Sequence, residues 1–158
     1  MTHLYLIRHG QADGLQADLN GTLVPNAGLS ATGIKQAERL RERLATTPDI
    51  QADVLLSSPL RRARETAQII APALGLAVLV DEDLQEINLA EAEGLTDEQI
   101  RDRFGLFHLE QEPFRRIARS GESLTGFHLR TCRALDRILR EYAGQSIVVV
   151  GHGGNSQC

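Results

Sequence analysis

The sequence predicts an α/β fold in which helices flank a mostly parallel central sheet. Short apolar runs at residues 4–7, 54–56 and 147–150 have the length and branched composition of buried strands. Segments with apolar residues at helical spacing lie between these runs, and such alternation favours parallel pairing of the strands. The 158 residues contain no evident linker or repeat, so we expect a single domain spanning residues 1–158.

The first strand and the helix that follows it have clear boundary signals. Gly10 comes soon after residues 4–7 and is a natural breaker that ends the strand. Ser30 begins a helix with charged residues on one side and apolar residues on the other. The apolar positions are Ile34, Ala37, Leu40 and Leu44. We therefore expect this helix to pack on the sheet.

The second strand leads directly into a second helix. Ser58 is the expected N-cap and Pro59 the expected first helical residue, because both types favour those positions. The helix should continue to Gly75. Its apolar positions are Leu60, Ala63, Ala67, Ile70 and Leu74.

The rest of the chain predicts one more strand, a long helix and two irregular segments. Residues 77–80 have the composition of a strand, and residues 124–142 show an apolar face that ends before Gly144. Residues 12–28 and 104–121 lack such a pattern. We expect them to border the binding crevice and to select the substrate.

Polar residues gather where the predicted strands end. Arg8 and His9 follow the first strand, and His152, flanked by glycines, follows the last. Ligands of open α/β sheets bind outside the carboxyl ends of the strands. Arg62 lies near the start of the second helix, where the helix dipole favours anions. These residues together predict a pocket for a phosphate group.

Four separated motifs carry a resemblance to a known family. They are R-H-G at residues 8–10, S-S-P-L-x-R-A-x-x-T-A from Ser57, L-x-E-x-x-x-x-E-x-E-G-L-T from Leu84, and G-H-G from Gly151. In this order they resemble the histidine phosphatase superfamily, the phosphoglycerate mutase-like proteins, over residues 4–154. The resemblance implies a three-layer α/β sandwich, phosphoryl transfer through a phosphohistidine, and neither a metal nor a cofactor.

The resemblance also assigns roles to individual residues. It makes His9 the nucleophile, His152 the second histidine and Glu86 the acid that protonates the leaving oxygen. Arg8 and Arg62 match the arginines that bind the phosphoryl group, and their charges suit the charge spread over its oxygens. The remaining expected contacts with the substrate come from Gly10, Gln11 and Gly153. Nearby arginines should also keep the His9 ring neutral, because like charges lower the pKa of a histidine.

Simpler interpretations exist for several of these residues. Glu91 and Glu93 share the acidic segment of Glu86, and only the family pattern selects Glu86 among them. His152 alone could be a hydrogen-bonded histidine of the core. Three arginines of the second irregular segment could hold a distal anion of the substrate or simply face solvent. They are Arg115, Arg116 and Arg119.

Composition argues against several other classes of function. The net charge of −4 gives no reason to expect nucleic acid binding, and no apolar run approaches the ~20 residues that span a bilayer. No signal sequence opens the chain and two cysteines give no disulfide framework, so we expect a cytoplasmic protein. A zinc site of His9, His152 and Glu86 is disfavoured, because two arginines would oppose the metal ion.

Two departures from the family pattern bear on function. Ala12 stands where many members carry a small hydroxyl residue, which removes one hydrogen bond to phosphate. The sequence ends at Cys158, where relatives generally continue through another helix and strand. Loss of that helix should expose apolar surface, so we expect reduced stability or association into a homo-oligomer that covers the face.

The leading expectation is a metal-independent hydrolase of a small phosphate monoester. The alternatives within the enzyme class are a phosphoglycerate mutase-type phosphotransferase and a protein phosphohistidine phosphatase. The short chain favours hydrolysis over the mutase reaction, and the L-Q-E segment around Glu86 argues against the phosphohistidine phosphatase. From another class, the chain could be a phosphate-binding or scaffold protein with impaired turnover.

Overall fold

The structure is a computed structural model that describes residues 1–13, 26–47, 50–106, 108 and 110–154. Within these residues, parallel strands form one sheet in the order β1-β4-β2-β3. The strands are β1 (His3–Arg8), β2 (Val54–Ser57), β3 (Val78–Val80) and β4 (Ser146–Gly151). The prediction of an α/β fold with a mostly parallel sheet is confirmed.

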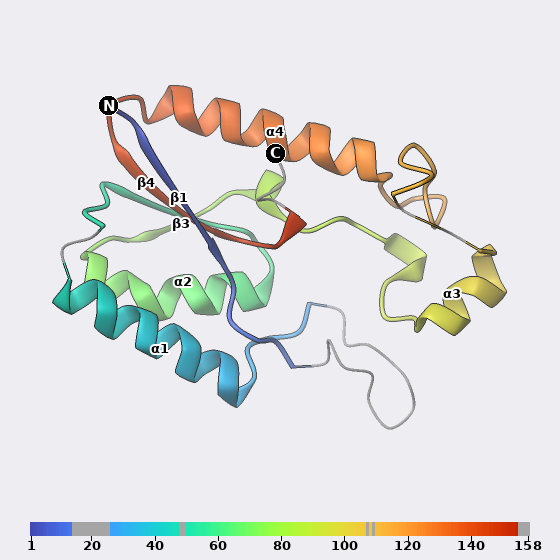
Figure 1. Cartoon of the computed structure of the whole chain (residues 1–158), viewed down its shortest axis with the longest axis horizontal. Helices are drawn as coiled ribbons and strands as arrows, with labels where there is room; N and C mark the ends of the chain where they lie inside the picture. Colours follow the sequence, from blue (N-terminus) through green and yellow to red (C-terminus); the bar gives the residue numbers. More distant parts are fainter. Residues whose placement is uncertain (14–25, 48–49, 107, 109, 155–158) are drawn as a thin grey trace.

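Helices cover both faces of this sheet and make the three layers that the family resemblance implies (Figure 1). One face carries α1 (Ala31–Thr46) and α2 (Arg61–Leu74), and the other carries α4 (Leu124–Glu141). Successive residues of β4 point to opposite faces, so Val148 and Val150 pack under α2 while Ile147 and Val149 pack under α4. Both faces are apolar, as expected of a buried parallel strand.

Between β3 and α4 the chain leaves the sheet. This segment contains two short 3-10 helices, η1 (Glu82–Leu84) and η2 (Ala90–Ala92), and the helix α3 (Asp97–Phe104). In Figure 1, α3 stands apart from the sheet on the side toward which β4 points. The described residues of 104–121 begin at the end of α3, and their place beside a binding crevice stays a prediction, whereas most of residues 12–28 lie outside the described residues.

The two predicted helix starts have different outcomes. Ser30 caps α1 as predicted, because its side chain accepts a hydrogen bond from the backbone of Gly33 at 3.0 Å. The prediction that Ser58 caps α2 is wrong: the helix begins at Arg61, and Leu60 is the cap residue without a side-chain bond. The Ser58 hydroxyl instead accepts from the Leu60 backbone at 3.2 Å. This turn places the Ser58 side chain toward His152, which follows the end of β4.

None of the helices in the described part of the chain is long and apolar enough to cross a bilayer.

Candidate active site

The His9 ring is held in one protonation state by two hydrogen bonds. Its Nδ1 lies 2.6 Å from the carbonyl oxygen of Gly10, and the Arg62 Nε–H donates to its Nε2 at 3.2 Å. A guanidinium can only donate, so Nε2 accepts, and Nδ1 carries the proton that it donates to Gly10. The lone pair of Nε2 is therefore directed toward Arg62.

His152 lies beside His9 at the end of the neighbouring strand β4. The ring centroids are 5.1 Å apart and meet edge to face. The Nε2 atom of His152 is 2.8 Å from the Ser58 hydroxyl, and only 3% of His152 is exposed. The prediction from sequence missed this role of Ser58, because a serine before a proline at a helix start has an obvious local use as a cap. Its place in the S-S-P-L motif was the available signal.

Arg62 and Arg8 bring positive charge to the two histidines. Arg62 lies in the first turn of α2 and is 8% exposed, and its carbonyl accepts a hydrogen bond from the Thr66 hydroxyl at 2.8 Å. That hydroxyl in turn accepts from the Gly10 backbone at 3.1 Å. Arg8 is the last residue of β1, and its guanidinium lies beside Gly153. Thr66 thus joins the arginine-bearing helix to the His9 loop.

Glu86 completes the cluster from the segment after η1. A Cβ atom built on Gly154 would lie 2.6 Å from its Oε1, so the carboxylate touches the backbone just beyond His152. The carboxylates of Glu86 and Glu93 both favour the charged form of Arg62, against burial, which lowers the pKa of that guanidinium. Glu91 is engaged elsewhere, because it accepts from the Ser120 hydroxyl at 2.6 Å. Glu86 therefore lies against Gly154, three residues beyond the end of β4, and its role as the acid stays a prediction.

The other predicted contacts have mixed outcomes. Gly10 is required by packing, since a Cβ there would lie 2.6 Å from the carbonyl oxygen of Gly33 in α1. A Cβ on Gly153 would make only ordinary contacts with Arg8. The Gln11 side-chain oxygen lies 3.4 Å from the Ser30 hydroxyl, at the start of α1. Contacts of Gly10, Gln11 and Gly153 with a substrate stay predictions.

Arg115 has a structural role in the segment after α3. Its guanidinium donates to the Glu112 carboxylate and to the carbonyl oxygens of Leu106 and Phe104, at 3.0 to 3.1 Å. These bonds close the loop on itself, which favours the structural interpretation over a distal anion site for this residue. Arg116 and Arg119 are exposed.

The surroundings lower the pKa of both histidines. For His9 the largest cause is burial, with smaller contributions from the charges of Arg62 and Arg8, and the Gly10 hydrogen bond opposes the shift. For His152, burial first and then the charge of Arg62 lower the pKa to about 3. The sequence indicated only the charges of the arginines as the cause of the neutral His9 ring, and burial is the larger cause. Both rings are thus neutral near pH 7, as a nucleophilic imidazole requires.

The buried neutral state of His152 predicts a loss of stability in acid. Above about pH 6.5 the ring is neutral in both the folded and the unfolded chain, so it makes no pH-dependent contribution. As the pH falls below that value, the unfolded chain binds a proton that the folded chain does not bind. The free energy of unfolding should then fall by up to about 1.4 kcal/mol per pH unit. Urea denaturation at several pH values measures this slope.

The matched variants for this measurement are His152→Gln and His3→Gln. The first removes the buried ring and should flatten the acid slope, whereas the second replaces an exposed histidine and should keep it. An unchanged slope in His152→Gln would show that other groups cause the acid sensitivity.

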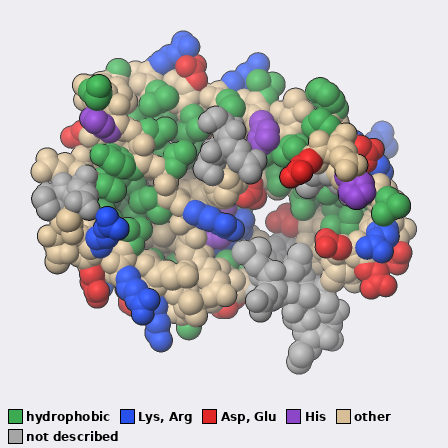
Figure 2. Space-filling view, viewed as in Figure 1, with side chains coloured by type: hydrophobic (Ala, Val, Ile, Leu, Met, Phe, Trp, Pro, Cys, Tyr) green, Lys and Arg blue, Asp and Glu red, His purple; other side chains and the backbone are tan. Residues whose placement is uncertain are grey.

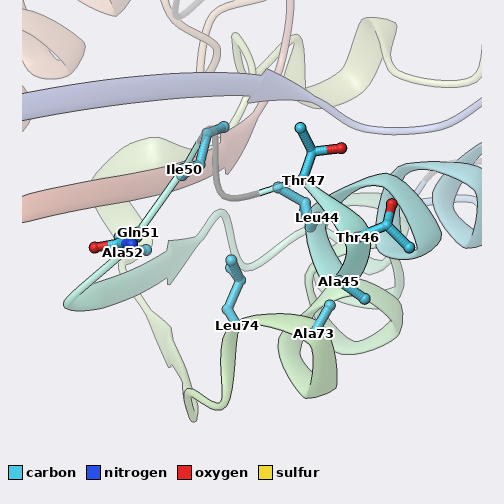
Figure 3. Close-up of a pocket in the computed structure, with 9 residues that line it drawn as sticks. All are labelled: Leu44, Ala45, Thr46, Thr47, Ile50, Gln51, Ala52, Ala73 and Leu74. Carbon is cyan, nitrogen blue, oxygen red and sulfur yellow. The ribbon is translucent and has the colours of Figure 1, made fainter.

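Two hollows of the surface differ in their chemistry. Figure 2 shows a hollow between the sheet and the part that contains α3, with basic and acidic side chains at its edges. A second pocket, of about 400 Å³, lies near the C-terminal ends of α1 and α2, at the opposite end of the sheet from the histidines (Figure 3). None of its described lining residues is ionisable; they are Leu44, Ala45, Thr46, Thr47, Ile50, Gln51, Ala52, Ala73 and Leu74. The described lining of this second pocket therefore supplies no acid or base for phosphoryl transfer.

Several known proteins are similar to this chain in sequence. The chain is 36% identical to phosphoglycerate mutase-like protein 4 of Arabidopsis thaliana, over 96% of this chain and 66% of that protein. It is 30% identical to phosphoserine phosphatase 1 of Hydrogenobacter thermophilus, over 96% of this chain and 71% of that protein. Other relatives are longer, and the chain spans 41% of a bifunctional protein of Mycobacterium tuberculosis.

Solved structures agree with these relatives. A mycobacterial glucosyl-3-phosphoglycerate phosphatase superposes with a TM-score of 0.75 at 28% identity, over 97% of this chain and 76% of that one. The α-ribazole phosphatase of Shigella flexneri superposes with a TM-score of 0.78 at 28% identity, over 97% and 75%. A sequence model of the histidine phosphatase superfamily, branch 1, matches residues 4–158. With the paired histidines and arginines at the strand ends, this match places the chain in the histidine phosphatase superfamily.

Proposed function

We propose that this chain hydrolyses a small phosphate monoester through a phosphohistidine formed on His9. The observation that carries the proposal is the neutral His9 ring, with its Nδ1 proton donated to Gly10 and its Nε2 lone pair facing Arg62. An anionic phosphoryl group bound by Arg62 would lie directly beside that lone pair. Relatives and solved structures named as phosphatases of small phosphate esters support the reaction class.

In the first step, Nε2 of His9 attacks phosphorus, the N–P bond forms and the bond to the ester oxygen breaks. Glu86 in its acid form gives its proton to the departing oxygen, so that an alcohol leaves rather than an alkoxide. Arg8, Arg62 and His152 stabilise the negative charge on the oxygens in flight. The products are a phosphohistidine, the alcohol and an ionised Glu86.

In the second step, water attacks the phosphohistidine. The Glu86 carboxylate takes a proton from the water as the new O–P bond forms, and the N–P bond breaks. Inorganic phosphate leaves, His9 regains its lone pair and Glu86 regains its proton. The neutral state of His9 serves the first step, because a protonated Nε2 has no lone pair for the attack.

The test is hydrolysis of p-nitrophenyl phosphate in EDTA, combined with rapid quenching of the enzyme during turnover. We expect turnover that persists in EDTA and a phosphoenzyme that survives alkali and is lost in acid, as expected of a phosphoramidate. Turnover abolished by EDTA, or an acid-stable phosphoenzyme, would overturn the proposed mechanism. A folded protein without turnover would instead favour the phosphate-binding role.

The mutase reaction is the second candidate, because one relative is named phosphoglycerate mutase-like. A mutase returns the phosphoryl group to an acceptor alcohol, whereas a phosphatase releases one inorganic phosphate for each ester cleaved. Measuring phosphate and alcohol together separates the two reactions. We expect equal amounts of both.

A further inference from the structure

The segment that carries Glu86 has no regular secondary structure, and a single arginine of α4 holds its backbone. Arg130 donates from Nη1 to the carbonyl oxygens of Asp83 at 2.7 Å and Gln85 at 3.2 Å. Its Nη2 reaches the carbonyl oxygen of Glu86 at 3.5 Å. One guanidinium therefore contacts the backbone carbonyl of the proposed acid and two carbonyl groups just before it.

Glu122 holds the same guanidinium from the other side. Arg130 donates to it through Nε at 2.8 Å and Nη2 at 2.7 Å, in a bidentate pair. The side chains of Arg130 and Glu122 are 17% and 24% exposed, so water screens this pair less than a surface pair. The planar fork of an arginine suits this arrangement, and a lysine could not reproduce it.

Glu122 also fixes the chain beyond the acid. Its Oε2 accepts from the Asn88 backbone at 3.0 Å, and its own backbone N–H donates to the Asn88 carbonyl oxygen at 2.7 Å. Burial alone would raise the pKa of Glu122, but the bonds from Arg130 and Asn88 lower it, so the residue is ionised at neutral pH. The Arg130–Glu122 pair thus holds the backbone on both sides of Glu86.

The same arginine also connects the acid to the end of β4. Its guanidinium carbon lies 5.4 Å from the centre of the Phe127 ring. A Cβ on Gly154 would lie 2.7 Å from that ring and 2.6 Å from Oε1 of Glu86. The Glu86 carboxylate and the Phe127 ring therefore both lie against Gly154, two residues after His152. A shift of the Glu86 segment would have to disturb several of these contacts.

We propose that Arg130 and Glu122 are positioning residues that place the Glu86 carboxyl group for proton transfer to the leaving oxygen. Neither side chain needs to touch the substrate; both act through the backbone of residues 83–88. Misplacing a catalytic group by about 1 Å can cost about a hundredfold in rate. This inference rests on the proposed phosphatase function and adds the device that orients its acid.

The test compares Arg130→Gln with wild type on two substrates of nearly the same shape, phenyl phosphate and p-nitrophenyl phosphate. Phenolate is a poor leaving group that needs the proton from Glu86, whereas p-nitrophenolate needs little help. We expect kcat/KM to fall about thirtyfold for phenyl phosphate and about threefold for p-nitrophenyl phosphate. Equal losses on both substrates, or no loss on either, would overturn the proposal, because a general structural defect does not depend on the leaving group.

A double-mutant cycle with Glu86→Gln tests whether Arg130 acts through the acid. Once the acid is removed, Arg130→Gln should add no further loss that is selective for phenyl phosphate. A full additional selective loss in the double variant would contradict the proposal. Arg133→Gln is the matched control, since it removes an exposed arginine from the same helix and should leave both rates unchanged.

If Arg130→Gln does not fold, Glu122→Gln tests the same positioning role of the Arg130–Glu122 pair. This change keeps the size of the side chain, weakens its bonds with Arg130, and should produce the same selectivity to a smaller degree. The same criteria apply to it: an unselective loss or no loss overturns the proposal. If the wild-type protein hydrolyses neither ester, the proposed phosphatase function is wrong. This inference, which rests on it, is then wrong as well.

Discussion

Replacing His9 with alanine is expected to reduce kcat/KM for p-nitrophenyl phosphate by about 10⁴-fold or more. The Nε2 atom of His9 is the proposed nucleophile, and its lone pair faces Arg62 at 3.2 Å. We expect no replacement by His152, because only 3% of that residue is exposed and its Nε2 lies 2.8 Å from the Ser58 hydroxyl. The loss should therefore affect kcat and phosphoenzyme formation together, as measured by steady-state rates and by rapid quenching.

Two controls separate this loss from damage to the fold. His3→Ala replaces an exposed histidine at the first residue of β1, away from the strand end that carries Arg8, and should retain wild-type turnover. Urea denaturation of His9→Ala and wild type at pH 7 shows whether the fold survives the loss of the ring's hydrogen bonds with Gly10 and Arg62. A folded His9→Ala protein that kept a tenth of the activity would exclude His9 as the nucleophile.

The strands and the main helices could be predicted from sequence because their signals are local. The run of branched residues in β4 alone indicates a strand buried on both faces, and the structure buries Val148 under one helix layer and Val149 under the other. Ser30 needs only its own turn to act as a cap. Ser58 has the same local signal, but its hydroxyl also lies 2.8 Å from His152, which is 94 residues later in the chain. The cap signal does not reveal a partner this distant in the chain, and only the place of Ser58 in the S-S-P-L motif marked it for a further role.

In the candidate site too, the positions of the main residues could be predicted from local signals, whereas the bonds between distant segments could not. His9, His152 and the two arginines are recognisable because each follows a strand or begins a helix, where topology brings their side chains together. The bonds that orient them run between distant segments, such as Thr66 with Gly10 and Arg130 with Gln85. An arginine on an amphipathic helix usually faces solvent, so nothing in the sequence near Arg130 marks it as a residue that holds the acid.

Replacing Gly33 with alanine is expected to destabilise the protein by roughly 2–4 kcal/mol, although alanine is the better helix former. Gly33 lies in the first turn of α1, and a Cβ there would lie 2.0 Å from the carbonyl oxygen of Gln11. The backbone of Gln11 would have to move away, and with it the adjoining Gly10 carbonyl that orients His9 at 2.6 Å. We therefore expect turnover to fall by about tenfold or more together with stability.

Gly126→Ala is the matched control for this clash. Gly126 occupies the same position in α4 as Gly33 does in α1, and in each helix the N-cap serine accepts a bond from this glycine's N–H. A Cβ on Gly126 would meet only the Ser123 hydroxyl, at 3.3 Å, so its substitution should change the free energy of unfolding by less than about 1 kcal/mol. Urea denaturation could give both variants the same stability, with Gly33→Ala keeping its activity. The backbone of Gln11 would then have moved aside without disturbing His9. The close contact between α1 and the His9 loop would then be dispensable for catalysis, contrary to this prediction.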